Sequence, residues 1–311
     1  MLYDLAIIGG GPAGVAAGVY ASRKRLKTIF ITDAFGGASN VSEDIQNWIG
    51  TVSISGEQLA KDLEKHLRAY ASDIVDIKTG ELVTLIEKVG EGSEQYFKIT
   101  TSKGSFEAKT VLTCAGSHRR KLTIPGADQF EHKGITYCAS CDGPVFTDQD
   151  VIVIGGGNAG FESAAQLLAY CKTVTLIQRG AEFRADPVTV KKLLANPKMK
   201  AISNTELIEV RGDKFANVLV YKDLGTGEIV ELPTGGIFVE IGLLPTTEFV
   251  KDLVTLDKNN HIVIDPRTQR TSVEGVWAAG DATDVLYHQN NIAAGDAVRA
   301  LEDIYIYLNT K

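Results

Sequence analysis

The chain has 311 residues, of which 44% are hydrophobic and 23% are charged, and its formal net charge is −7. That length suits about two domains of ordinary size, and the composition excludes a mainly disordered chain. An acidic protein without runs of Lys or Arg lacks the basic surface that nucleic acids and anionic membranes attract. We therefore expect neither nucleic acid nor membrane as a partner.

Two further features concern the cellular setting. Residues 5–22 carry no charge, but they contain five glycines and a proline and follow Asp4, which suits neither a membrane span nor a secretion signal. Four cysteines are too few for the disulfide framework of a small secreted domain. We therefore expect a cytoplasmic, reducing location.

The first predicted elements are a strand at residues 5–8, the turn GGGPAG at residues 9–14, an alanine-rich helix and a second strand at residues 28–32. In a dinucleotide-binding turn, three glycines allow a tight turn, close approach of the phosphates and helix–strand packing. The N-terminus of the helix attracts the phosphates, and an acid about 20 residues later binds the ribose. The predicted site residues here are Gly9, Gly11, Pro12, Ala13, Gly14 and Asp33, which we expect to end the second strand.

Helical and strand patterns fill the residues that follow. Ser55 and Gln58 have the spacing of a capping box, and the apolar positions 59, 63, 67 and 70 predict one face of a helix. Residues 82–115 predict short strands, with turns at residues 90–92 and 103–104.

The pattern of strand, glycine turn, helix and strand returns at residues 151–177. Its turn, GGGNAG, supplies the site residues Gly155, Gly157, Asn158 and Gly160. An NAD site would place an acid at the end of the next strand, but this strand ends in Gln178 and Arg179, with Arg184 close behind. Arginine suits a 2′-phosphate and so predicts NADP. A single glycine motif is weak support for a nucleotide site, whereas two in matching contexts are much stronger.

The remaining pattern predicts a helix at residues 187–195, strands near residues 207, 218 and 237, and a strand at residues 262–264. It ends with the segment GVWAAGDAT at residues 275–283 and a helix at residues 291–308. The fold class is therefore α/β, with two Rossmann-like dinucleotide-binding domains, the second inserted into the first. We expect residues 1–115 and 246–311 to form an FAD-binding domain, and residues 116–245 to form an NAD(P)H-binding domain that carries a cysteine pair.

Cys138 and Cys141 form a C-x-x-C motif just before the second glycine unit. Redox chemistry suits such a pair, because the motif closes a small disulfide ring that opens by thiol exchange. A zinc site would need two more ligands. Cys114, Cys171 and the five histidines do not have the usual spacing of zinc ligands, so we expect no metal. Asp142 could move a proton during exchange or could simply cap the following turn.

Together, the two glycine motifs, the segment from Cys138 to Gly143 and GVWAAGDAT resemble the low-molecular-weight thioredoxin reductase family over essentially the whole chain. In that family the first glycine motif binds FAD. The resemblance implies that Gly280 and Asp281 of the late segment contact the flavin as well. It also implies flavin contacts for Asn47. Further flavin contacts are implied for His288, Gln289 and Asn290, which stand in the position of the family's arginine-glutamine-alanine motif.

The same resemblance implies an activity. NADPH would pass electrons through FAD to the disulfide of Cys138 and Cys141, and the dithiol would reduce thioredoxin or a thioredoxin-like protein. Cys141 would face the flavin, Cys138 would attack the partner, and Asp142 would act as the acid and base. Family members rotate the nucleotide domain between these two tasks and are usually homodimers.

Departures from the family pattern leave other readings open. The NADP signature, histidine-arginine-arginine, is here Gln178-Arg179-Gly180, and His288 replaces an arginine. NADH, ferredoxin or reduced flavin are therefore alternative donors, and a dithiol oxidase would share the fold and the cysteines. A peroxiredoxin-reducing flavoprotein normally carries an extra amino-terminal module with its own C-x-x-C, whereas here the flavin motif starts near residue 4. A non-catalytic flavin-binding scaffold would need the cysteine pair to be accidental.

Overall fold

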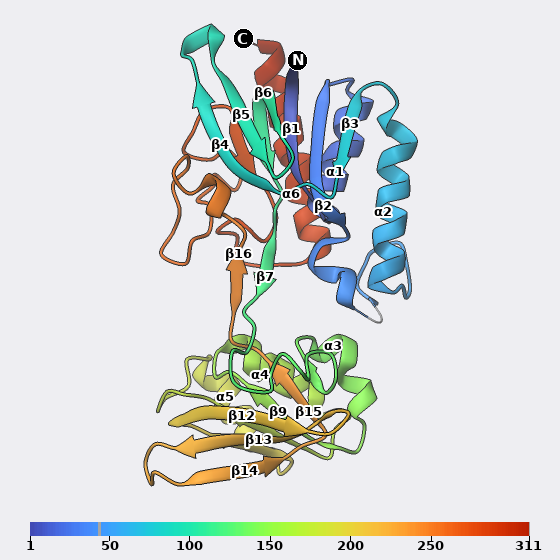
Figure 1. The fold of residues 1–311 in the computed structure, drawn as a ribbon. Helices are drawn as coiled ribbons and strands as arrows, with labels where there is room; N and C mark the ends of the chain where they lie inside the picture. The colour runs from blue at the N-terminus through green and yellow to red at the C-terminus, as the bar shows by residue number, and fades with distance from the viewer. Residues whose placement is uncertain (43–44, 311) are drawn as a thin grey trace. The chain divides into compact units, whose positions relative to one another are not determined.

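The computed structural model describes residues 1–42 and 45–310, without the side chains of Val41, Ser93, Ser140 and Cys141. The chain forms two compact units, Met1–His118 with Leu244–Lys311, and Arg119–Leu243. The boundaries expected from the sequence, 115/116 and 245/246, lie three and two residues away from these. The chain enters the second unit through β7 (Ser117–Arg119) and leaves it through β16 (Leu243–Pro245), and these two strands pair (Figure 1).

The first unit is built on a seven-stranded sheet in the order β3-β2-β1-β6-β5-β4, with β17 also paired to β6. The strands β1, β2, β3, β6 and β17 run parallel, while β4 and β5 extend the sheet in antiparallel fashion. A nearly continuous apolar run forms β1, as expected for a parallel strand that is covered on both faces. The bounds are β1 (Leu2–Gly10), β2 (Thr28–Phe35), β3 (Val75–Thr79), β4 (Val83–Val89), β5 (Tyr96–Thr101), β6 (Ser105–Thr113) and β17 (Val276–Ala278).

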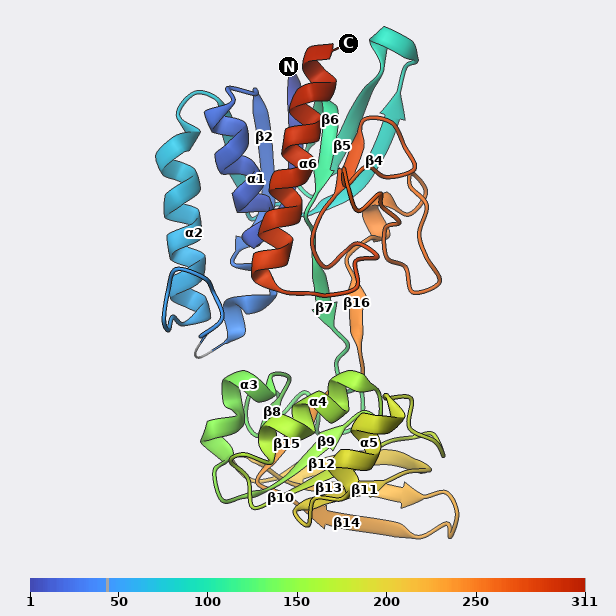
Figure 2. The same ribbon diagram turned by 180° about the vertical axis from the view of Figure 1, so that it is seen from behind.

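Three helices cover one face of this sheet, as Figures 1 and 2 show: α1 (Pro12–Arg23), α2 (Gly56–Ala71) and α6 (Asn290–Thr310). Their apolar faces pack on Phe30, Leu112 and Trp277 in one buried cluster. The predicted cap of α2 is confirmed, because Ser55 accepts a hydrogen bond from Gln58 N at 3.2 Å. Short 3-10 turns complete the unit at η1 (Gly37–Val41), η2 (Gly92–Glu94) and η4 (Glu248–Val250).

The second unit has an all-parallel sheet in the order β11-β10-β9-β15-β8 and a small antiparallel sheet, β12-β13-β14. The parallel strands are β8 (Ile135–Thr136), β9 (Asp150–Ile154), β10 (Thr173–Ile177), β11 (Met199–Ile202) and β15 (Gly236–Val239). The antiparallel strands are β12 (Thr205–Gly212), β13 (Ala216–Asp223) and β14 (Ile229–Pro233). The helical segments are α3 (Ala139–Asp142), η3 (Gly143–Phe146), α4 (Asn158–Leu167) and α5 (Pro187–Leu194).

This topology brings three carboxyl ends together in the second unit. The strand β15 lies between β9, which leads into the second glycine turn, and β8, which leads to Cys138. In open parallel sheets ligands bind at the carboxyl ends of the strands. The glycine turn and the cysteine segment therefore lie at the same edge of one sheet.

Two local predictions need correction. Residues 262–264 do not form a strand, because Ile262 alone bridges to Leu256 on one side and Thr283 on the other. Asp33 does not end β2, which continues to Phe35 because a register shift lets that residue pair with the end of β1. The predicted helices at residues 187–195 and 291–308 are confirmed as α5 and α6. None of the helices in the described residues is long and apolar enough to span a membrane.

Candidate active site

The first glycine turn joins β1 to α1 with very close backbone packing. A Cβ atom on Gly9 would lie 2.2 Å from Cys114 O, and one on Gly14 would lie 1.8 Å from Gly9 O. Gly11, the N-cap of α1, differs, because apart from its chain neighbours the nearest described atom, Gly37 Cα, lies 3.8 Å from the corresponding position, which is an ordinary contact. Pro12 occupies the first turn of the helix, where its missing N–H costs nothing. The uncrowded backbone at Gly11 would form a cradle that admits a dinucleotide phosphate close to the N-terminus of α1.

The segment GVWAAGDAT at residues 275–283 lies against the N-terminal end of α1. Gly280 has a φ of +78°, and a Cβ atom there would lie 3.3 Å from Ala293 Cβ and 3.5 Å from Ala13 Cβ. Gly280, the residue before Asp281, therefore lies beside the first turns of both α1 and α6. Burial raises the pKa of Asp281, and the nearby His288 opposes that rise.

Residues far apart in sequence also meet in a small amide cluster in this unit. Asn47 donates from Nδ2 to Gln289 Oε1 at 3.1 Å, and Asn291 donates from Nδ2 to Asn47 O at 2.7 Å. Ser39 donates to Asn290 Oδ1 at 3.0 Å. The structure thus brings together the predicted residues Asn47, Gln289 and Asn290, and it adds Asn291, for which the sequence carries no motif. These residues and the open turn fit an FAD molecule, while Asp33 lies exposed on β2.

The second glycine turn repeats this arrangement between β9 and α4. Gly155 has a φ of +135°, and a Cβ atom on Gly160 would lie 2.0 Å from Gly155 O. Apart from Gly157 itself and its two chain neighbours, no described residue has a heavy atom within 4 Å of the Cβ position of Gly157, so the space before α4 is open. Asn158, the first residue of α4, accepts a hydrogen bond from Asp186 N at 2.8 Å. This turn therefore also fits a dinucleotide.

The residues that predict the nucleotide preference lie beside that turn. Gln178 is buried and donates from Nε2 to Gly180 O at 2.9 Å, while Arg184 N donates to Gly156 O at 2.9 Å. The side chains of Arg179 and Arg184 are exposed, and within the described residues neither guanidinium has an ion-pair partner. Both are therefore free to bind an anionic group.

The cysteine segment follows β8. Cys138 is disulfide-bonded and is the N-cap of α3. Its N–H donates to Thr136 Oγ1 at 3.4 Å, and the Thr136 hydroxyl donates to Asp142 Oδ2. The Cys141 side chain lies outside the described part of the structure. Thr136 therefore connects Asp142 with Cys138, a link that no sequence motif signals because threonine is common in strands.

The other two cysteines are buried free thiols. Cys114 follows β6 beneath the first glycine turn, and Cys171 follows α4. Burial raises the pKa of both thiols, which suppresses the reactive thiolate. Their role is packing.

One acid that the sequence patterns did not single out lies at the nucleotide edge. Glu240 directly follows β15, and a Cβ atom on Gly155 would lie 2.1 Å from its carbonyl oxygen. Its side chain is 13% exposed and accepts a hydrogen bond from Ser163 Oγ on α4 at 2.7 Å. The signal that could have identified it is an acid placed immediately after an apolar strand of a parallel sheet.

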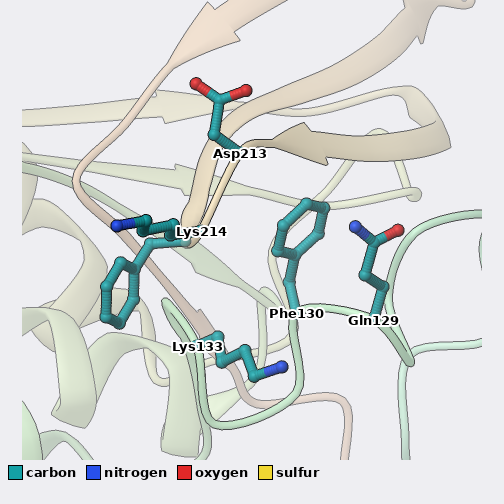
Figure 3. A pocket seen from close by; sticks show the side chains of 6 residues that line it. Gln129, Phe130, Lys133, Asp213 and Lys214 are labelled. Carbon is teal, nitrogen blue, oxygen red and sulfur yellow. The ribbon is translucent and has the colours of Figure 1, made fainter.

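The second unit also has a cavity of about 370 Å³ between the loop at residues 129–133 and the turn from β12 to β13 (Figure 3). Its lining residues are Gln129, Phe130, Lys133, Asp213, Lys214 and Phe215. None of these is a predicted site residue. Among the described residues, no group of three or more His, Cys, Asp or Glu side chains could hold a metal ion.

Similar sequences carry the names of alkyl hydroperoxide reductase and NADH dehydrogenase. A protein of Xanthomonas campestris pv. phaseoli, named as a subunit of alkyl hydroperoxide reductase, is 39% identical over 308 residues, which is 98% of this chain and 57% of that protein. A protein of Bacillus subtilis named NADH dehydrogenase is 35% identical over 98% of this chain and 58% of its own length. The chain thus spans less than three fifths of these curated relatives.

Similar solved structures span the whole chain. The thioredoxin reductase from Streptococcus pyogenes MGAS5005 has a TM-score of 0.82 and 34% identity, covering 100% of this chain and 99% of that one. The Lactococcus lactis thioredoxin reductase in its FR conformation has a TM-score of 0.75 and 34% identity, covering 99% and 100%. The predicted α/β fold with two Rossmann-like units is confirmed, as is the resemblance to low-molecular-weight thioredoxin reductases.

The sequence profile of the family described as pyridine nucleotide-disulphide oxidoreductase matches residues 3–297. Membership implies FAD and a pyridine nucleotide as the redox groups, which agrees with two open glycine turns in two separate units. With a family match over nearly its whole length, this chain belongs to the pyridine nucleotide-disulphide oxidoreductases.

Proposed function

We propose that this protein is a flavin-dependent reductase of protein disulfides, with Cys138 and Cys141 as its redox-active pair. The observation that carries the proposal is the disulfide-bonded Cys138 at the same sheet edge as an open glycine turn. Asp142 is linked to Cys138 through Thr136. Residues 1–118 and 244–311 would bind FAD, and residues 119–243 would bind the nucleotide.

Bound FAD would supply two-electron transfer from the nucleotide to the disulfide, which becomes two thiols as two protons are taken up. Asp142 takes the proton of the Cys138 thiol, the Cys138 thiolate attacks one sulfur of the partner's disulfide, and the other partner sulfur leaves with that proton from Asp142. The Cys141 thiol then gives up its proton and attacks Cys138 in the mixed disulfide, and this proton passes to the second partner sulfur. That second exchange releases the other partner thiol and re-forms the disulfide of Cys138 and Cys141.

NADPH is the proposed donor. Two exposed arginines, Arg179 and Arg184, lie next to the second glycine turn, and neutral Gln178 occupies the place of the acid that NAD sites use. The proposed acceptor is thioredoxin or a thioredoxin-like protein, in keeping with the thioredoxin reductases among the solved relatives.

A second candidate is the reduction of a peroxiredoxin with NADH. It is favoured by the relatives named for alkyl hydroperoxide reductase and NADH dehydrogenase, which are more than one third identical to this chain. The two candidates share the cysteine chemistry and differ in donor and acceptor.

Anaerobic stopped-flow absorbance of the FAD-loaded protein separates the candidates. We expect NADPH to bleach the flavin faster than NADH, and the reduced enzyme to reduce thioredoxin faster than a peroxiredoxin. Reversed preferences in both assays would support the second candidate. The absence of any response to either nucleotide would indicate ferredoxin or reduced flavin as the donor.

The cysteine assignment has its own test. The variants Cys138→Ser and Cys141→Ser are expected to keep FAD absorbance and bleaching by NADPH, and to lose reduction of protein disulfides. The matched control is Cys171→Ser, which replaces a buried thiol outside the pair. Disulfide reduction that persists in Cys141→Ser would refute the assignment of that thiol.

A further inference from the structure

Glu240 joins three parts of the second unit at the nucleotide edge. Its backbone touches the first residue of the glycine turn, Gly155, and its N–H donates to Ile154 O at 2.8 Å. Its carboxyl group binds Ser163, which lies on α4 five residues after Asn158. Arg119 Nη1, where the chain enters the unit, lies 3.6 Å from the same carboxyl oxygen. The Glu240 side chain thus holds α4 against the end of β15, the strand next to the central strand β9.

The charges around this carboxyl group are unbalanced. Burial raises the pKa of Glu240, whereas the Ser163 hydroxyl and the Arg119 guanidinium lower it. The exposed Glu162 on α4 adds repulsion. The neighbouring strands β9 and β8 end in Ile154 and Thr136, which do not ionise. A buried acid with incomplete compensation at a ligand edge is typical of a functional group.

We propose that Glu240 is a positioning residue for the pyridine nucleotide, which holds the N-terminus of α4 in place and takes up a proton when the nucleotide's phosphates bind. This inference rests on the proposed function, because it needs a nucleotide at the second glycine turn. The nucleotide's phosphates would bind at the N-terminus of α4, within one or two helical turns of the Glu240 carboxyl group. At that range their negative charge favours the neutral form of the carboxyl group. Neutral Glu240 keeps an acceptor for Ser163, so α4 stays anchored in the bound state.

The proposed proton uptake determines how the affinity for the nucleotide changes with pH. Affinity for the nucleotide is highest at low pH, where Glu240 is already neutral before binding. Affinity falls as the pH rises through the pKa of the free and then of the bound protein. For each pH unit by which the nucleotide raises the pKa of Glu240, the affinity is tenfold lower above both pKa values than below them.

The test is calorimetric titration of the FAD-loaded protein with NADP⁺, which cannot reduce the flavin. Titrations at several pH values in buffers of different protonation enthalpy count the protons taken up. We expect the wild type to take up more protons than Glu240→Gln, which keeps an oxygen for Ser163. The 2′-phosphate of NADP⁺ also titrates, but its contribution is common to both proteins and cancels in the difference.

Two further variants sharpen this test. Glu162→Gln removes a nearby charge that raises the pKa of the Glu240 carboxyl, so the proton uptake should move to lower pH. Ser163→Ala removes a bond that favours the charged carboxyl, so the uptake should move to higher pH. Thermal denaturation verifies that each variant is folded.

The outcomes are distinct. Equal proton uptake by wild type and Glu240→Gln at every pH would refute the role of Glu240 while leaving the nucleotide site intact. If neither NADP⁺ nor NAD⁺ binds the wild type, the proposed function itself fails, and this inference fails with it.

Discussion

At the scale of single residues, Thr136 shows how an unremarkable side chain can organise a reactive segment. Its hydroxyl donates to Asp142 and accepts from the N–H of Cys138, so one oxygen orients both groups. Thr136 is buried at the end of the two-residue strand β8, and its position is therefore set by the sheet. The carboxyl group of Asp142 is therefore held in one orientation, which favours proton transfer.

We predict that Thr136→Val slows disulfide reduction about tenfold, because a hydrogen bond to a carboxylate is worth about 1.5 kcal/mol. Thr136→Ser keeps the hydroxyl and should retain most of the rate. The measurement is single-turnover reduction of a protein disulfide as a function of pH. A positioning role changes the pH profile as well as the rate. An unchanged profile in Thr136→Val would contradict it.

The two exposed arginines carry a second prediction. Arg179→Ala combined with Arg184→Ala should raise the KM for NADPH roughly tenfold, because charge-assisted bonds to the 2′-phosphate are lost. The KM for NADH should stay the same. Lys191→Ala with Lys192→Ala, two exposed charges on α5, is the control for a general loss of positive charge. Equal losses for both nucleotides would refute the predicted preference.

The site residues that the sequence predicted and those it missed differ in how far along the chain their contacts reach. Glycine turns and a C-x-x-C pair are local patterns, because backbone geometry and ring size depend on neighbours in the chain. Glu240 and Asn291 act through partners 77 and 244 residues away, Ser163 and Asn47 respectively. Such contacts exist only once the sheet and helices have formed, so a single sequence carries no pattern for them.

At the scale of elements, the glycines of each turn divide into two kinds. Gly14 and Gly160 are needed because a Cβ atom would collide with the backbone of the first glycine of the same turn, Gly9 or Gly155. Gly11 and Gly157 meet no such contact among the described residues and adopt extended backbone that any residue can adopt. Protein packing therefore explains the first kind, and the proposed approach of a dinucleotide phosphate would explain the second.

This division predicts opposite effects for a matched pair of substitutions. Gly11→Ala should fold with a loss of at most about 1 kcal/mol, yet bind FAD much more weakly, because its methyl group enters the open cradle. Gly14→Ala should lose about 1–3 kcal/mol of folding stability through overpacking. Thermal denaturation of the apoprotein and the FAD content by absorbance measure the two effects. A Gly11→Ala protein that retains normal FAD content would contradict the assignment of this cradle.

Element prediction succeeded where periodicity or capping is strong. The helix α2 begins directly after its capping residue Ser55, and α6 contains a long apolar repeat. Prediction failed at residues 262–264, where the apolar run Ile-Val-Ile has the composition of a strand. The segment pairs through one residue only, because its neighbours Leu256 and Thr283 belong to irregular chain. Strand formation depends on a partner of matching length, which composition does not report.

At the scale of the whole molecule, each unit has its own hydrophobic core. The first unit buries clusters on both faces of its seven-stranded sheet, around Trp277 on the helical face and Phe97 on the other. The second unit buries two further clusters, around Ile152 and Phe161. The described part of the chain contains one open glycine turn in each unit. Each ligand should therefore stabilise only the unit that binds it.

We predict that differential scanning calorimetry of the apoprotein resolves two transitions. A ligand at 100 times its Kd adds about 2.7 kcal/mol to the unit that binds it, which raises that transition by on the order of 5–10 °C. FAD should move one transition and NADP⁺ the other. In Gly11→Ala the shift caused by FAD should disappear while the shift caused by NADP⁺ remains. A single transition that both ligands move equally would instead mean that the two units unfold as one cooperative body, despite their separate cores.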